Sequence, residues 1–171
     1  MSEETTHRIV LVRHAKSAHP DVDDHERPLA ERGRNDAPAA GRRLAGSGVT
    51  PDLALVSTAA RTRETWKLMA AELPAKPRTV HEERIYEASV GELIAILNEV
   101  SDEVRDLVVV GHNPGIQALA DALAGEAEGD LMSRMRSGFP TSAIAVLSFQ
   151  GSWKSVEHGA GRLVDFWTPH A

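Results

Sequence analysis

Short aliphatic runs alternate with longer stretches of helical periodicity, and this alternation constrains the fold more than any other feature of the chain. Buried strands are predicted at residues 8–12, 53–56 and 107–110, and alternating or edge strands at 144–149 and 162–167. Helices are predicted at about 30–45, 59–72, 90–100 and 114–123. Because strands that alternate with helices pair in parallel, we predict an α/β fold, a three-layer α/β/α arrangement with a mostly parallel central sheet.

The size and composition of the chain indicate one domain. Its 171 residues are 42% hydrophobic and 26% charged, which suffices for a core without covalent staples. The absence of cysteine excludes disulfides, thiolate metal sites and a cysteine nucleophile. We expect a single domain over residues 1–171, with a flexible N-terminal segment at residues 1–7.

The charge balance narrows the class of partner. A net charge of −6 at pH 7 disfavours binding to nucleic acid or to an anionic membrane surface. The first residues lack the basic start and apolar stretch of a signal peptide, and no apolar run approaches the ~20 residues that span a bilayer. We therefore expect a cytoplasmic protein, a monomer or weak homodimer, with neither nucleic acid nor membrane as a partner.

Basic and imidazole side chains follow each of the three buried runs. Arg13 and His14 follow the first, Arg61 comes after the second, and His112 and Asn113 follow the third. The carboxyl ends of parallel strands meet at one edge of a sheet, so these side chains should converge there. Guanidinium groups form bidentate hydrogen bonds to phosphate oxygens, and a helix N-terminus after His112 would add free backbone N–H groups. The pattern indicates phosphoryl transfer through a phosphohistidine.

Smaller residues beside these side chains have expected roles as well. Gly111 would let the backbone approach a ligand closely, and Ser57 or Thr58 could cap the helix that follows. Lys16 and Ser17 could touch the phosphate, although a position on the rim without contact fits them equally well.

The segments that carry these residues resemble the three motifs of the histidine phosphatase superfamily, which also holds the phosphoglycerate mutases. These segments are residues 11–15, 57–65 and 110–114. Finer features resemble the small SixA-type phosphohistidine phosphatase branch, and they lie at residues 27–29, 32–33, 111–115 and 139–141. The resemblance runs from residue 8 to the last predicted strand and implies a phosphoglycerate mutase-like fold.

The resemblance implies a role for each matched residue. His14 would be the nucleophile that accepts the phosphoryl group. The phosphate oxygens would be held by Arg13, Arg61, His112 and the backbone of Asn113. The nearby arginines should lower the pKa of His14 from its ordinary ~6.5 and keep it neutral for attack. No metal or organic cofactor would be needed.

Glu87 matches the position at which many superfamily members place a general acid, in the pattern hydrophobic-x-Glu-x-x-x-Gly over residues 85–91. Protonating an alkoxide leaving group is worth roughly 10²–10⁴-fold, whereas an imidazole leaving group depends less on that help. Glu87 thus leaves ester hydrolysis open beside phosphoramidate cleavage. Glu82 and Glu83 are close enough to share the assignment, and a solvated loop carboxylate is also open.

Two departures from the larger relatives bear on the substrate. Pro20 stands where many of them carry a phosphate-binding Asn. The larger mutases also have inserted helices that close over the substrate. We do not expect such helices here, because residues 125–138 are the only loose stretch after His112. We expect residues 19–27 and 125–138 to form an open rim, which suits a phosphohistidine displayed on a protein.

The sequence thus predicts a metal-independent phosphatase that forms a covalent phosphohistidine on His14. The expected substrate is phosphohistidine on a protein such as a signalling phosphotransfer domain. A small phosphorylated metabolite is the alternative substrate, and a mutase is less favoured because it needs a closed site. Two other classes stay open: a phospholigand-binding module without turnover, and a metal-dependent hydrolase using residues 19–25, whose spacing fits neither a helix-borne ligand pair nor a calcium loop.

Overall fold

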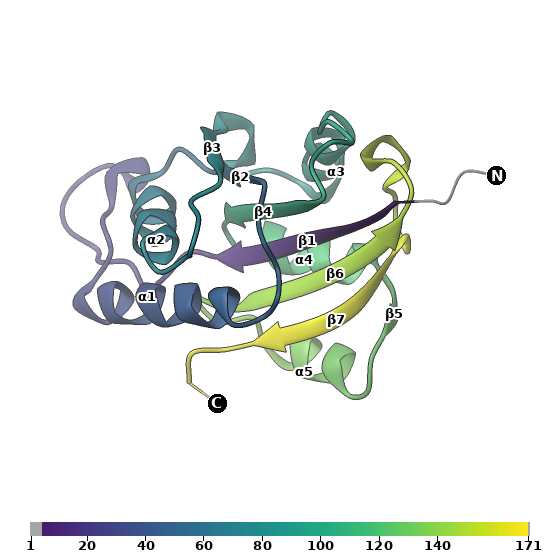
Figure 1. Cartoon of the computed structure of the whole chain (residues 1–171). Coiled ribbons are helices and arrows are strands. Elements are labelled where there is room, and N and C mark those ends of the chain that lie inside the picture. Colours follow the sequence, from purple (N-terminus) through teal and green to yellow (C-terminus); the bar gives the residue numbers. More distant parts are fainter. Residues whose placement is uncertain (1–4, 171) are drawn as a thin grey trace.

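The computed structural model describes residues 5–170, which form one seven-stranded sheet with helices on both sides (Figure 1). The strands are β1 (Thr6–Arg13), β2 (Leu53–Val56), β3 (Arg78–His81), β4 (Asp106–Gly111), β5 (Ala124–Ala127), β6 (Ile144–Gln150) and β7 (Gly161–Trp167). The α-helices are α1 (Glu31–Ala45), α2 (Ala60–Ala70), α3 (Val90–Asn98), α4 (Gly115–Leu123) and α5 (Leu131–Ser137). Short 3-10 helices are η1 (Asp24–Glu26), η2 (Glu83–Ile85) and η3 (Trp153–Ser155). The predicted α/β fold is confirmed.

The strand order is β3-β2-β4-β1-β6-β7-β5, and β6 alone among these strands runs against its neighbours. The sheet is therefore mostly parallel, as predicted. In the register of the central strands, Arg13 of β1 is the partner of Gly111 of β4, and Val56 of β2 is the partner of Val110 of β4. This register brings the loops that leave β1, β2 and β4 together at one end of the sheet.

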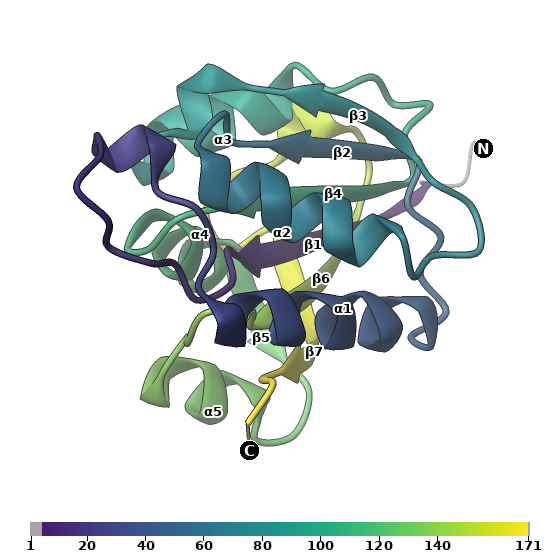
Figure 2. The same cartoon turned by 90° about the vertical axis from the view of Figure 1, so that its left-hand side faces the viewer.

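Helices cover both faces of the sheet, which explains why apolar and polar residues do not alternate along β1. Successive strand residues point to opposite faces, and here both faces are covered. Val10 and Val12 pack in the cluster that includes Leu44 of α1 and Met69 of α2, the two helices in front of the sheet in Figure 2. Ile9 and Leu11 pack on the other side in the cluster that includes residues of α3, α4 and α5.

Two strands and one α-helix of the structure have no counterpart in the sequence-based prediction: β3, β5 and α5. The prediction that residues 125–138 are loose is wrong, because β5 pairs with β7 and α5 buries Leu131 and Met135. The residues of β3 and α5 are mostly polar, and β5 consists of Ala, Gly and Glu, so the stability of each element comes from a neighbouring strand or core. Local periodicity therefore carries little trace of them.

The predicted flexible segment at residues 1–7 is only partly within the described part of the chain. Residues 1–4 lie outside the described residues. Thr6 and His7 belong to β1, opposite Gln150 and Phe149 of β6, so for these two residues the prediction is wrong. The reason is packing: His7 is 1% exposed and stacks on Phe149.

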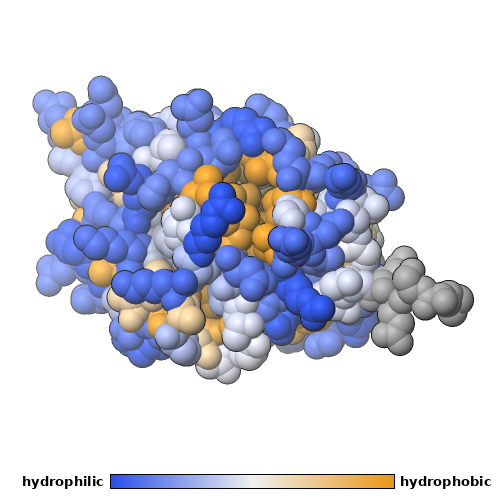
Figure 3. Space-filling view, turned by 45° about the horizontal axis from the view of Figure 1, so that its top comes forward, coloured by the Kyte–Doolittle hydropathy of each residue, from blue (hydrophilic) through white to orange (hydrophobic). Residues whose placement is uncertain are grey.

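The face of the molecule seen in Figure 3 is mostly hydrophilic. With the top of Figure 1 tilted forward, a hollowed hydrophobic area shows through a frame of hydrophilic side chains (Figure 3). Within residues 5–170, no helix has the length and apolar character required to cross a bilayer.

Candidate active site

The three loops predicted to converge do so at the carboxyl ends of β1, β2 and β4. The backbone N–H of His14 donates to the carbonyl of Gly111 at 3.0 Å, and that of Ser57 donates to the carbonyl of Val110 at 3.1 Å. The rings of His14 and His112 lie 5.5 Å apart between centroids. Residues almost a hundred positions apart thus form one cluster.

His14 is held as a neutral imidazole with a defined tautomer. Its Nδ1 lies 2.7 Å from the carbonyl oxygen of Ala15, which can only accept, so Nδ1 carries the proton and Nε2 keeps its lone pair. Burial first, and then the positive charges of Arg61, Arg13 and Arg27, lower the pKa of His14 to about 4. The predicted direction is confirmed, but burial contributes more than the arginines do.

The arginines are anchored from other parts of the chain. Arg13 Nη1 donates to the carbonyl of Phe139 at 3.1 Å. Arg61 is 6% exposed, and its Nη1 and Nη2 donate to the backbone carbonyl and the carboxylate of Asp24 at 2.7 and 3.0 Å. The Nε atoms of Arg13 and Arg61 are buried without a hydrogen-bond partner among residues 5–170. Each guanidinium is thus fixed in place and keeps a donor that an anion could satisfy.

His112 contacts Ser57, which does not have the capping role proposed for it. His112 Nε2 lies 2.7 Å from Ser57 Oγ. The cap residue of α2 is Ala59, without a side-chain hydrogen bond, and Thr58 Oγ1 lies 2.8 Å from Nε2 of His25. The capping prediction is wrong because β2 pairs with β4 and so places Ser57 beside His112.

The charge state of His112 is also set by its surroundings. Burial first, and then the neighbouring His14 and Arg61, lower its pKa to about 3. Near neutral pH, His112 is therefore a neutral hydrogen-bonding group, and its buried Nδ1 has no partner among the described residues.

Asn113 and Gly111 shape the turn after β4. Asn113 Oδ1 accepts from the backbone N–H of Gln117 at 3.2 Å, and Nδ2 donates to the carbonyl of Phe139 at 3.0 Å. The cap residue of α4 is Pro114. A Cβ on Gly111 would lie 3.0 Å from the Ile116 side chain and 3.1 Å from that of Ile85. Packing of these side chains accounts for the glycine, so the expectation of close approach to a ligand is not needed.

The loop at residues 19–27 reaches the site through Asp24, which sequence reasoning did not single out. Besides Arg61, the carboxylate accepts from Arg27 Nε at 3.0 Å and from the hydroxyl of Tyr86. The hydrogen bond from Tyr86, followed by those from Arg61 and Arg27, holds the pKa of Asp24 well below its usual range. Nothing in the sequence distinguishes Asp24 from the neighbouring Asp23, because the distinction arises from the path of the loop.

The histidines of this loop do not assemble the metal site that their spacing left open. His19 Nδ1 lies 2.9 Å from Arg27 Nη1, whereas His25 contacts Thr58 and the edge of the Tyr86 ring. Among residues 5–170, no three His, Asp or Glu side chains lie close enough to hold a metal ion. The donor set of residues 19–25 therefore does not fit a metal.

Ser17 and Glu87 occupy different places in the site. Ser17 is buried, and its Oγ accepts from Arg27 Nη1 at 3.1 Å, so it positions that arginine. Glu87 is exposed and lines a pocket of about 320 Å³ together with Asp24, Arg61 and His112, here called the Arg61–His112 pocket. Glu82 instead pairs with Arg84. The geometry thus favours Glu87 over Glu82 as the carboxylate at the pocket.

Two non-glycine residues beside the site have left-handed backbones. Glu87 has a φ of 59° and Ser142 a φ of 66°. The N–H of Ser142 donates to the carbonyls of Arg13 and His14, both at 3.1 Å. Such conformations cost energy and persist where the surroundings enforce them, often at functional sites.

Comparisons with known proteins agree with this geometry. The model of the histidine phosphatase superfamily (branch 1) matches residues 9–159. An uncharacterized protein of Mycobacterium tuberculosis is 44% identical over 161 residues, which cover 92% of this chain and 99% of that protein.

Solved structures extend the match. A protein of Agrobacterium tumefaciens proposed to be the phosphohistidine phosphatase SixA is 33% identical, with a TM-score of 0.80 and coverage of 95% of this chain and 98% of that one. Its counterpart from Nakamurella multipartitia is 29% identical, with a TM-score of 0.85 and coverage of 99% and 100%. This chain therefore belongs to the histidine phosphatase superfamily, in its SixA-type branch, and is a phosphatase.

Proposed function

We propose that the protein removes the phosphoryl group from phosphohistidine on a partner protein, through a covalent phosphohistidine at Nε2 of His14 and without a metal ion. The observation that carries the proposal is the tautomer of His14. With Nδ1–H bound to Ala15, a lone pair on Nε2 is available amid the charges of Arg13, Arg27 and Arg61.

In the first step, the Nε2 lone pair of His14 attacks phosphorus in line with the leaving group. The new P–N bond forms as the P–N bond of the substrate breaks, and the electron pair of that bond returns to the substrate imidazole. Arg13, Arg61 and neutral His112 donate hydrogen bonds to the equatorial oxygens, where charge develops. A substrate imidazole that is protonated on its other nitrogen leaves as a neutral group.

In the second step, water attacks the phosphorus of phosphorylated His14. The P–N bond breaks, its electrons return to Nε2, and both protons of the water leave with inorganic phosphate as dihydrogen phosphate. Because burial and the arginines disfavour a charged imidazole, His14 returns to its neutral, reactive form.

The open surroundings of the site support a protein substrate. Between α4 and β6 the chain forms β5 and α5, and α5 packs with β7, where the rings of Phe139 and Phe166 lie 5.5 Å apart. No residue of that segment lines the Arg61–His112 pocket. The similarity to the proposed SixA proteins supports the same class of substrate. The proposed partner is a cytoplasmic signalling phosphotransfer domain. This protein would bind it as a monomer or a weak homodimer.

A small phosphorylated metabolite is the second candidate substrate, and Glu87 is the observation that favours it. The carboxyl group on the wall of the Arg61–His112 pocket could protonate an alkoxide leaving group. A phosphohistidine substrate has less need of such an acid.

The test compares kcat/KM for a phosphohistidine-bearing carrier protein with that for a panel of phosphomonoesters, in the presence of EDTA. The variant His14→Ala serves as the blank. We expect a large preference for the carrier that disappears in the variant. A preference for one small ester would keep the mechanism and replace the substrate, and loss of activity in EDTA would contradict the metal-independent mechanism.

A further inference from the structure

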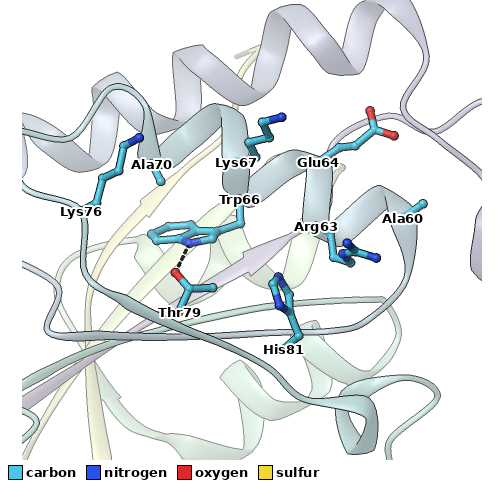
Figure 4. Close-up of a pocket in the computed structure, with 9 residues that line it drawn as sticks. All are labelled: Ala60, Arg63, Glu64, Trp66, Lys67, Ala70, Lys76, Thr79 and His81. Atoms are coloured by element: carbon cyan, nitrogen blue, oxygen red, sulfur yellow. Dashed lines mark hydrogen bonds between the residues drawn. The ribbon is translucent and has the colours of Figure 1, made fainter.

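A cleft of about 600 Å³ lies between α2 and β3, outside the Arg61–His112 pocket (Figure 4). Its apolar wall includes Ala60, Ala70 and Trp66, and Trp66 Nε1 donates to Thr79 Oγ1 at 2.9 Å. The two cavities share no lining residue. We call this feature the α2–β3 cleft.

Cations surround the α2–β3 cleft without anionic partners. Arg63, Lys67 and Lys76 line it and are exposed, and none of the three lies within ion-pair distance of an acidic side chain among residues 5–170. On neighbouring α1, by contrast, Arg42 pairs with Glu72 at 3.1 Å. Glu64 adds one carboxylate to the lining, so the cleft keeps a positive balance in a chain whose net charge is −6.

Two of these cations repel each other. Arg63 and Lys67 are four residues apart on α2 and so lie on the same helix face, where like charges destabilise the helix. An anion bound between them would remove this cost. In Figure 4, Arg63 lies beside His81 and Lys76 lies near Ala70 at the other end of the cleft, whereas Lys67 extends from α2 above Trp66. Positive charges spread along the cleft in this way could bind an elongated anionic ligand.

The strand on the other side of the cleft is a sheet edge. β3 is the first strand in the sheet order and pairs with β2, which leaves its outer backbone edge without a strand partner in the described part of the chain. Such an edge can accept an extended peptide through main-chain hydrogen bonds. An extended polypeptide with carboxylates therefore fits both the edge and the charges.

A nucleic acid fits the cleft less well. Bases bind single-strand sites by stacking on exposed aromatic rings, whereas Trp66 is 4% exposed and its indole N–H is already bound. The net charge of −6 also opposes a polyanion as long as a nucleic acid strand.

We propose that the α2–β3 cleft docks an extended acidic segment of the phosphorylated partner protein, which rests on the proposed function. Helix α2 carries Arg61 of the Arg61–His112 pocket in its first turn and Lys67 of the cleft six residues later. At 1.5 Å per residue these positions are about 9 Å apart along the helix. One partner could therefore place its phosphohistidine in the pocket and an acidic segment in the cleft.

The first arm of the test measures binding of an oligoglutamate peptide at low ionic strength. The variant Lys67→Glu/Lys76→Glu is compared with Arg105→Glu/Lys154→Glu, which makes the same change in charge at exposed cations outside the cleft. We expect the cleft variant to bind about tenfold more weakly or worse, and the control to bind within about twofold of the wild type. Circular dichroism checks folding, and Lys76→Glu alone serves if the double variant does not fold.

Three binding results would overturn the proposal. They are no binding of oligoglutamate to the wild type, an equal loss in the control variant, and tighter binding of a single-stranded oligonucleotide than of oligoglutamate at the same salt concentration.

The second arm measures turnover, which separates this proposal from the proposed function. We expect the cleft variant to raise KM for a phosphohistidine carrier that bears an acidic segment, and to leave turnover of a small phosphoramidate unchanged. Phosphoramidate turnover without oligoglutamate binding would overturn docking and leave the proposed function standing. Oligoglutamate binding without phosphohistidine turnover would overturn the proposed function, and with it the identification of the docked partner as the substrate.

Discussion

The Arg61–His112 pocket and the α2–β3 cleft both gather cations around helix α2, but they hold them differently. At the pocket, Arg61 is buried, with two hydrogen bonds to Asp24, and nearby Arg13 is bound to the carbonyl of Phe139. At the cleft, Lys67 and Lys76 are exposed and make no ion pair with the described acidic residues.

This difference separates chemistry from docking. Fixed guanidinium groups lose little freedom when charge develops on a phosphoryl group, which favours them for stabilising a transition state. Flexible exposed lysines suit weak, salt-dependent attraction of a partner. Changes in the pocket should therefore act mainly on kcat, and changes in the cleft mainly on KM for a large substrate.

Removing the proposed nucleophile should produce the largest effect. We expect His14→Ala to reduce kcat by about 10⁴-fold or more, because Nε2 of the neighbouring His112 is already engaged with Ser57. Steady-state turnover of a small phosphoramidate measures the loss, and thermal unfolding confirms the fold. Activity near that of the wild type would refute the covalent mechanism.

Replacing the guanidinium of Arg61 with an ammonium group should have the next largest effect. Arg61→Lys keeps the charge but loses the planar fork that Asp24 holds, and we expect kcat to fall by roughly 10²–10³-fold. Arg42→Lys, at an exposed cation on α1, is the matched control and should change kcat little. Equal losses in both variants would show that fixation of Arg61 does not matter.

The leaving group should determine the effect of Glu87. We expect Glu87→Gln to slow phosphomonoester hydrolysis by roughly 10- to 100-fold, and phosphohistidine hydrolysis by much less, because imidazole leaves without strong acid assistance. Glu83→Gln is the control, since Glu83 does not line the Arg61–His112 pocket. The ratio of kcat/KM values for the two substrates is the measurement. Equal losses on both substrates would contradict the leaving-group argument.

The smallest expected effect is the response of the wild type to mild acid. His14 must be neutral to attack, and its pKa is lowered to about 4, so activity is retained above that value and lost as pH falls through it. At pH 5 such a histidine is about nine-tenths neutral, whereas an ordinary pKa of ~6.5 would leave about 3% neutral. The pH profile of kcat/KM measures this, and an acid limb near pH 6.5 would contradict burial of His14.

The local sequence pattern predicted the strands that are buried on both faces and the helices whose apolar residues recur over several turns. The helices α1 to α4 and the strands β1, β2, β4, β6 and β7 lie within a few residues of their predicted bounds. The elements β3, β5 and α5 escaped prediction because edge pairing and contact with the core stabilise them more than their own residues do.

The sequence by itself determined which side chains meet at the end of the sheet, because strand ends and the parallel register bring His14, Arg61 and His112 together. The tertiary structure decided their states and their neighbours. Burial sets the charge of both histidines, the loop at residues 19–27 brings Asp24 to Arg61, and the pairing of β3 creates the α2–β3 cleft. These depend on contacts between residues far apart in the chain, which local spacing does not encode.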